Sequence, residues 1–201
     1  MSDTAPKIDP EVLDAARRTM RQHGWKGTTA DRIATEAGIS RVTLHRRGIK
    51  REHILTALTE LAVDAYREAM WPPLVDDGTG AERLKQGLGA LCEVAEEHLE
   101  VLTALSVASD EIFHEPAAGG AEVQTRTPFT EPIERLLSDG IGDGTIRNID
   151  DPRETATVLF NAVGWTYIHL RTGHNWPPPK ARDTTLDLVL NGLLNDRASG
   201  T

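Results

Sequence analysis

Cysteine, aromatic residues and long apolar runs are all scarce in this sequence. Cys92 is its only cysteine, so no disulfide can form within the chain and nothing indicates an oxidising compartment. No stretch approaches the roughly 18 consecutive apolar residues of a membrane-spanning helix. The first residues, MSDTAPKIDPEV, are polar and lack the apolar core of a secretory signal. We therefore expect a cytoplasmic protein with no membrane partner.

Charge is distributed unevenly along the chain. The 201 residues carry a net charge of −9, which by itself argues against a nucleic-acid partner. Residues 1–55, however, hold 11 Lys and Arg against seven Asp and Glu, a net charge of +4, whereas the remaining residues carry −13. This asymmetry indicates a small basic head that binds a polyanion and a larger acidic body.

The spacing of apolar residues predicts an all-α fold. Apolar residues recur at helical spacing along most of the chain, and no run alternates in the way of a β-strand. The first helix is expected to begin at Asp9-Pro10 and to end at Gly24. Two short helices follow, the first capped by Thr28 or Thr29 and the second capped by Ser40.

The rest of the chain is expected to form longer helices. One runs from residue 51 to residue 70 and ends at Trp71-Pro72-Pro73, because a proline disfavours helical geometry in the residue before it. Trp176–Pro179 is expected to be a stiff connector. The further helices are predicted at about 81–97, 99–114, 128–141, 152–171 and 182–196.

The two short helices are separated by Ala37-Gly38-Ile39-Ser40, which is typical of a helix-turn-helix. Gly38 tolerates the positive φ that this turn needs, and Ala34 is small enough for the helices to cross closely. Such a unit places the N-terminal part of its second helix in the major groove of double-stranded DNA. There arginine can bind guanine, and valine or threonine can contact a thymine methyl group. The residues predicted to face the bases are Arg41, Val42, Thr43, His45 and Arg46.

Residues 12–55, VLDAARRTMRQHGWKGTTADRIATEAGISRVTLHRRGIKREHIL, resemble the DNA-binding domain of the TetR family of bacterial transcriptional regulators. They align without gaps to that family's pattern A-A…G-x-x-x-T-T…I-A…A-G-V-S…T-L-Y…F…K-E-x-L. The resemblance implies a three-helix DNA-binding head over residues 1–50. Over residues 51–201 it implies a long linking helix and a helical body that binds an effector and forms dimers. It also implies a repressor that a small molecule releases from a palindromic operator.

The resemblance adds DNA contacts outside the second short helix. The hydroxyl groups of Thr29 and Ser40 are expected to bind phosphates together with the helix N-termini that they precede. Thr28, which precedes Thr29, is also predicted to contact DNA. Arg51 stands where the family has a lysine, and its guanidinium can also bind phosphate.

Two further positions depart from the family pattern. The tyrosine that usually follows T-L is His45, which keeps an aromatic ring with hydrogen-bonding atoms and adds the possibility of protonation. The usual phenylalanine position is Gly48, which leaves a hole in the small core of the head. Ile49, one residue later, is expected to fill it.

A DNA-binding head of this size binds tightly only when two heads act together, usually across a twofold axis. The last two expected helices carry apolar stripes at helical spacing, which could form a four-helix bundle with a second copy of the chain. The alternative is that both stripes face only the core of their own chain. The predicted dimer-interface residues are Val158, Leu159, Ala162, Thr166, Leu186, Val189, Leu190 and Leu193.

The resemblance implies that the body binds a small molecule between the linking helix and the penultimate helix. Each candidate could also be ordinary core filling. The sequence indicates no cofactor and no metal site, and it does not identify the effector. The candidate pocket residues are Trp71, Leu88, Cys92, Phe113, Phe129, Trp165 and His169.

Two other functions stay open. A DNA-binding regulator could be controlled by a partner protein or act constitutively, without a small-molecule ligand. A metal-dependent helical enzyme is the more remote alternative, since Glu111 and His114 would share one helical face, but a di-metal bundle needs two such pairs and two further glutamates. The chain contains no nucleophile elbow, phosphate loop, paired CxxC or HExxH motif, so we do not expect an enzyme.

Overall fold

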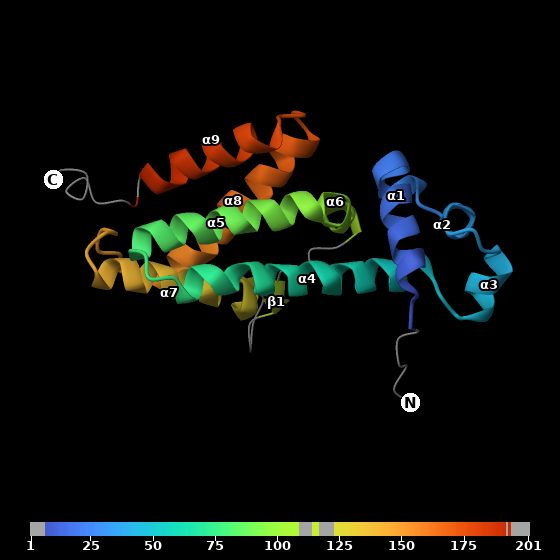
Figure 1. Ribbon diagram of the computed structural model, residues 1–201, viewed down its shortest axis with the longest axis horizontal. Helices are drawn as coiled ribbons and strands as arrows, with labels where there is room; N and C mark the ends of the chain where they lie inside the picture. The colour runs from blue at the N-terminus through green and yellow to red at the C-terminus, as the bar shows by residue number, and fades with distance from the viewer. Residues whose placement is uncertain (1–6, 109–113, 117–122, 192, 194–201) are drawn as a thin grey trace. The chain divides into compact units, whose positions relative to one another are not determined.

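The structure is a computed structural model that describes residues 7–108, 114–116, 123–191 and 193 (Figure 1). Helices make up nearly all of the regular structure in these residues, which confirms the predicted all-α fold class. The elements are α1 (Pro10–Gly27), α2 (Ala30–Glu36), α3 (Arg41–Arg46), α4 (Arg51–Val75), α5 (Gly80–Glu97), α6 (Leu99–Ala108), β1 (His114–Pro116), β2 (Val123–Thr125), α7 (Thr127–Gly142), α8 (Pro152–Thr172) and α9 (Pro178–Asn191). Among the described helices, none is both long and apolar enough to cross a membrane.

The described residues form two compact units. The head unit contains residues 7–64 and 98–108, and the body unit contains residues 65–97, 114–116, 123–191 and 193. Helix α4 therefore begins in the head unit and ends in the body unit. Helix α6 belongs to the head unit although it follows α5 in the sequence. The functional boundary predicted after residue 50 stays a prediction.

Two expected helix boundaries are wrong, both at prolines. Helix α4 continues through Pro72 and Pro73 to Val75, because the missing N–H groups affect only the end of the helix. The Asp76 N–H closes that end by donating to the Pro72 carbonyl over 3.1 Å. Helix α9 begins at Pro178 rather than at residue 182. The prolines in its first turn cost no hydrogen bond, because N–H groups there have no partner within the helix.

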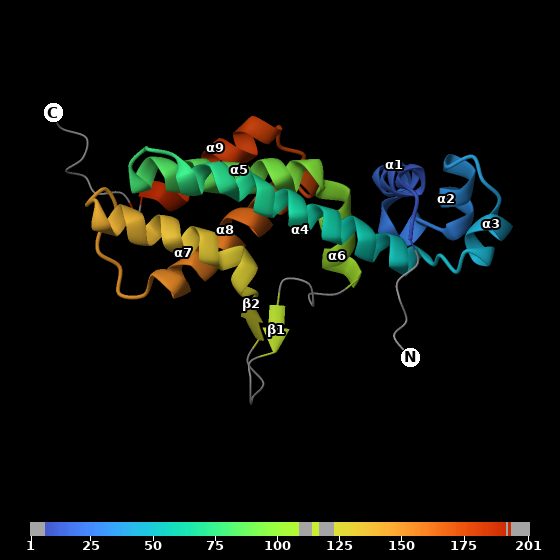
Figure 2. The same cartoon turned by 60° about the horizontal axis from the view of Figure 1, so that its bottom comes forward.

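Two other boundaries show how local geometry limits a helix. Gly24, the expected end of the first helix, has a φ of +62° and kinks α1, and helical turns resume beyond it as far as Gly27. The helix expected over residues 99–114 ends at Ala108, and His114 lies in β1 instead. β1 pairs with β2 in antiparallel register, His114 opposite Thr125 (Figure 2). These short strands have no alternating apolar pattern, so periodicity does not predict them.

Helix α5 is the central element of the body unit, where it packs against α7, α8 and α9. Beside it, Tyr66 of α4, Phe129 of α7 and Phe160 of α8 form an aromatic cluster. The ring centroids of Phe129 and Phe160 lie 5.3 Å apart, and those of Tyr66 and Phe129 lie 5.7 Å apart. The Tyr66 hydroxyl donates to the Phe129 carbonyl over 2.6 Å, so this buried polar group is satisfied.

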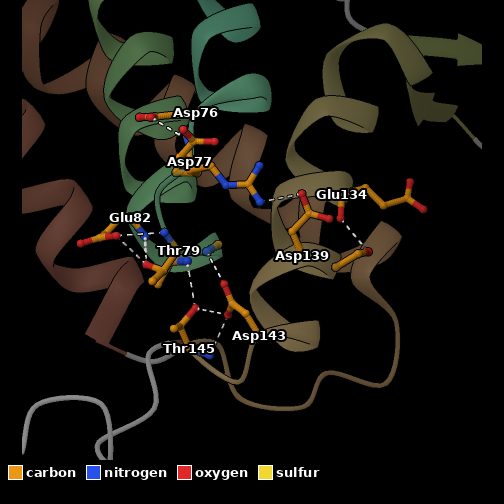
Figure 3. Close-up of polar contacts among 12 residues, drawn as sticks. Asp76, Asp77, Thr79, Glu82, Glu134, Asp139, Asp143 and Thr145 are labelled. Atoms are coloured by element: carbon orange, nitrogen blue, oxygen red, sulfur yellow. Dashed lines mark hydrogen bonds and ion pairs between the residues drawn. The ribbon is translucent and has the colours of Figure 1, made fainter.

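The N-terminus of α5 is bonded to the turn that follows α7 (Figure 3). The Asp143 carboxylate accepts a hydrogen bond from the Gly80 N–H over 2.6 Å, and Thr145 Oγ1 accepts one from the Ala81 N–H over 3.1 Å. These oxygens satisfy N–H groups that have no partner within the helix. The backbones of Gly80 and Gly140 approach so closely that a Cβ on Gly80 would lie 2.2 Å from the Gly140 Cα.

Gly80→Ala is therefore expected to lower the free energy of unfolding by about 2 kcal/mol or more, because the two backbones must move apart. Gly89→Ala is the matched control, since Gly89 also lies in α5 but a Cβ there meets no heavy atom within 4 Å. That control should raise stability by about 0.5–1 kcal/mol through helix propensity. Urea unfolding measures both, and equal midpoints for the two variants would contradict the close approach.

Candidate nucleic-acid interface

Helices α2 and α3 are both capped by side-chain hydroxyl groups. Thr29 Oγ1 accepts a hydrogen bond from the Arg32 N–H over 3.3 Å, and Ser40 Oγ accepts one from the Thr43 N–H over 3.1 Å. Between the helices, Gly38 has a φ of +68°, which glycine adopts without steric cost. The turn and both caps therefore lie at the positions that the sequence predicts.

The end of α3 shows how the chain accommodates the glycine at position 48. Gly48 has a φ of +67° and donates its N–H to the His45 carbonyl over 3.0 Å. The Ile49 N–H donates to the Leu44 carbonyl over 3.1 Å, and the side chain of Ile49 is buried. Ile49 thus lies in the small core, as expected for a residue that fills the space left by Gly48.

Helix α3 presents a mixed polar and apolar surface to solvent. Arg41 and Val42 are 71% and 72% exposed, and His45 and Arg46 are also exposed. Thr43 is half-buried, with its hydroxyl 2.9 Å from Ser40 Oγ. The predicted base-facing residues therefore lie on one accessible helix. Val42 is exposed on this helix and does not contribute to the core. This surface can offer a guanidinium and an apolar contact to base edges.

Two residues predicted to contact DNA make contacts within the head unit. Thr28 is fully buried and donates its hydroxyl to the Gly24 carbonyl over 2.8 Å, so its side chain cannot reach DNA. Arg51 donates from Nη1 to the Thr28 carbonyl over 3.1 Å, and its guanidinium lies 4.3 Å from the centre of the Trp25 ring. It also forms an ion pair with Glu52. The burial of Thr28 corrects its prediction, whereas Arg51 keeps 34% of its side-chain surface exposed and its phosphate contact stays a prediction. A local motif does not contain these tertiary contacts.

The remaining cations of the head unit divide into bonded and unpaired groups. Within the head unit, Arg17 and Arg21 contact Glu100, Arg18 contacts Glu36, Arg47 contacts Asp9, and Arg32 donates to the Gly27 carbonyl. In the described part of that unit, the exposed cations with no ion-pair partner are Lys7, Lys26, Arg46 and Lys50. The sequence predictions missed Lys26 and Lys50, because only the fold shows which cations are already bonded.

Residues 12–58 match the family model described as bacterial regulatory proteins, tetR family. The chain carries the DNA-binding head of this family. DNA-binding regulation of transcription is therefore its general function, and the resemblance predicted from residues 12–55 is confirmed. No curated protein matches the chain.

Solved structures share the fold of this chain along most of its length. The TetR family transcriptional regulator PfmR from Thermus thermophilus is 19% identical and covers 91% of this chain and 98% of its own, with a TM-score of 0.69. A TetR/AcrR regulator from Thermobifida fusca is 21% identical over 90% and 96%, with a TM-score of 0.67. FadR from Bacillus subtilis, solved with stearoyl-CoA, is 19% identical over 90% and 97%, with a TM-score of 0.65.

The body unit contains a groove of about 980 Å³ between the end of α4, α5 and α9. Its lining combines apolar and small residues with charged ones, and most of the charges are already bonded: Glu82 accepts from Thr79, and Arg182 pairs with Asp183. Lys85 has no ion-pair partner among the described residues. Gly89 lies in the lining with open space beyond its Cα, which leaves room for a ligand.

A smaller pocket of about 310 Å³ lies between α5, α8 and the first turn of α9. Cys92 contributes to its lining, and burial raises the pKa of this thiol to about 12, so it stays protonated at neutral pH. At the same pocket, Arg171 donates two hydrogen bonds of 2.7 Å to Glu96, and the Tyr167 hydroxyl donates a third over 2.9 Å. The hydrogen bonds from Arg171 hold the pKa of Glu96 below its usual value.

The predicted effector residues do not converge on either cavity. Of the seven, Cys92 lines the smaller pocket and none lines the groove. Leu88 and Phe129 are buried core residues, whereas Trp71 and His169 are exposed and Trp165 is half-buried. Phe113 lies outside the described residues. Helical spacing identified apolar positions but could not show which of them border a cavity.

The predicted dimer stripes divide into two groups. Leu159, Leu186, Leu190 and Leu193 are buried within the body unit, so they serve its own core rather than a second copy. Val158 is 63% exposed, Thr166 is exposed, and Ala162 and Val189 are half-buried. The prediction missed Leu188 of α9, which is 78% exposed. Helical spacing in the sequence identifies an apolar stripe but does not show whether it faces the core of its own chain or a second copy.

The metal-site alternative loses its geometric basis. His114 lies in a strand, so it cannot share a helical face with Glu111, which lies outside the described residues. Across the described ranges, no three His, Cys, Asp or Glu side chains are grouped in a way that could hold a metal ion.

Lys50→Ala should weaken binding to all duplexes about equally, because Lys50 is an exposed cation outside α3 with no ion-pair partner among the described residues. The slope of log affinity against log salt should fall by about one unit, and the melting temperature should not change. Arg51→Ala should instead lower the melting temperature, because it removes the contacts to Thr28 and Trp25, together worth about 1–2 kcal/mol. Salt titrations and thermal melts of both variants test this division, which equal melting temperatures would contradict.

Proposed function

We propose that the protein is a dimeric repressor that a small-molecule effector releases from a palindromic operator. The single observation that carries the DNA-reading part is the accessible surface of α3 from Arg41 to Arg46, held by two hydroxyl caps and a buried core. A helix with exposed Arg, Val and His side chains suits the major groove.

Exposed apolar residues on α8 and α9 support the dimer. Val158 of α8 and Leu188 of α9 are each more than half exposed. Two large apolar side chains in such positions favour burial against a second copy, and a twofold dimer would also bring two heads to one operator. Dimer formation is thereby coupled to the affinity for DNA.

Support for the effector comes from the groove and from the fold. FadR from Bacillus subtilis, which shares this fold, binds stearoyl-CoA in its solved structure. In the present chain, the groove of about 980 Å³ is large enough for a small molecule and is lined by residues of α4 and α5. These helices continue into, or are joined to, segments of the head unit, so a ligand that shifts them can alter DNA binding.

Selection from random duplexes with the purified protein should enrich a palindrome whose half-sites lie about one helical turn apart. Val158→Glu/Leu188→Glu should convert the dimer to a monomer in analytical ultracentrifugation and weaken binding to the selected palindrome by at least about tenfold, because the second head is lost. Glu60→Gln, a change at an exposed polar position of α4, is the control. Enrichment of a single half-site by a monomer would contradict the proposal.

Gly89→Leu tests the groove as the effector site. The variant should fold normally, because the Cβ has open space, while the longer side chain fills the groove. Small molecules that raise the melting temperature of the wild-type chain and release its operator should lose both effects with Gly89→Leu, whereas Gly89→Ala should retain them. Molecules that act equally on Gly89→Leu would place the effector site elsewhere.

A further inference from the structure

Arg41, the first residue of α3, forms an ion pair with Asp31 of α2, with 3.2 Å between Arg41 Nη1 and Asp31 Oδ2. This pair spans the helix-turn-helix and lies on its exposed surface. We propose that Asp31 is a positioning residue that fixes the guanidinium of Arg41 and so sets which base pair the head prefers. The proposal rests on the proposed function, in which Arg41 contacts base edges.

Among the described residues, Asp31 is the only one that forms a polar contact with the Arg41 side chain and so orients it. Arg41 is 71% exposed and follows the cap residue Ser40, so the positive end of the α3 dipole lies beside its guanidinium and does not hold it. A free arginine of this kind samples many rotamers and loses that freedom when it binds a base. An ion pair with Asp31 restricts the rotamers before DNA arrives, which lowers that cost for one geometry.

Asp31 itself lies on a rigid element. It is in the first turn of α2, where a carboxylate is favoured by the helix dipole. Thr29 caps this helix, and Ile33 and Ala34 anchor it in the core of the head unit. The carboxylate therefore has a defined place relative to α3.

The geometry of the pair leaves donors for DNA. The contact uses Nη1 of Arg41, so Nη2 and Nε are available to the O6 and N7 acceptors of a guanine. The other paired arginines differ. Arg51 has three partners within the head unit, and Arg18 donates from both Nε and Nη2 to Glu36. Among the ion-paired arginines in the described part of the head unit, Arg41 has the most exposed side chain, at 71% against 59% for Arg21.

A carboxylate beside DNA also repels phosphates, and this effect must be separated from positioning. Repulsion lowers the affinity for every sequence alike, because phosphates carry no sequence information. Positioning changes the ratio of affinities between operators that differ at one base pair. Asp31→Glu separates the two effects, since it keeps the charge but moves the carboxylate by one methylene group.

The experiment measures binding of the selected operator and of its single-base variants at each half-site position. Arg41→Ala should identify the base pair that Arg41 reads, where a good bidentate contact discriminates about 5- to 160-fold. Asp31→Asn and Asp31→Glu should each reduce discrimination at that same base pair to about one third or less of the wild-type ratio. Asp31→Asn should also tighten binding to random DNA, and Asp31→Asn/Arg41→Ala should discriminate no less than Arg41→Ala alone.

Glu11→Gln is the matched control. Glu11 is an exposed acid in the first turn of α1 with no partner among the described residues, so the change removes the same charge from the same unit without touching α3. It should leave every base preference unchanged. Melting temperatures of all variants near that of the wild type would show that the folds are intact.

Two results would overturn the positioning role. In the first, Asp31→Asn tightens binding to all duplexes equally, and Asp31→Glu behaves as the wild type, which leaves Asp31 with a charge effect only. In the second, Arg41→Ala changes no base preference, which also removes Arg41 from the proposed base contacts. The first result would leave the proposed repressor function intact, whereas the second would count against its base contacts. Failure of the positioning role is therefore distinguishable from failure of the proposed function.

Discussion

The ion pair between Arg17 of α1 and Glu100 of α6 is the contact on which the head unit depends. Arg17 Nε lies 2.7 Å from Glu100 Oε1, Arg21 lies 3.6 Å from the same oxygen, and the Glu100 side chain is only 7% exposed. A carboxylate so deeply buried would be strongly unfavourable without these partners. The short helices α1 to α3 bury little apolar surface by themselves, so packing of α6 on α1 completes a core that they cannot form alone.

This contact gives α6 a second role. Because α6 belongs to the head unit and follows α5 of the body unit directly at His98, the chain passes between the units there, as it does within α4. The groove is lined by both α4 and α5. Under the proposed function, an effector bound there acts on the two helices through which the chain reaches the head unit. Covalent continuity is then sufficient for coupling, provided that the ligand favours one arrangement of these helices over another.

Local patterns predicted the head well and the body less well, for physical reasons. Caps at Thr29 and Ser40 and the turn at Gly38 depend on a few neighbouring residues, so their spacing in the sequence is sufficient. The contacts of Arg51 with Trp25 and the Thr28 carbonyl were not predicted, because these partners are distant in sequence. The groove and the outward faces of α8 and α9 depend on how helices pack, which periodicity does not encode. The prolines of α4 show that a local helix-ending signal can yield to such packing.

The distribution of charge in the head argues for reading DNA with two heads. Sequence counts give residues 1–55 a net charge of +4, but most of their arginines are bonded to acids or carbonyls within the head unit. Lys7, Lys26, Arg46 and Lys50 are the exposed cations left unpaired in its described part. Neutralising one phosphate with each would give a salt slope of only about −3.6 for a single head. Under the proposed function, so small an electrostatic contribution leaves base contacts from α3 and the pairing of two heads as the main sources of tight and selective binding.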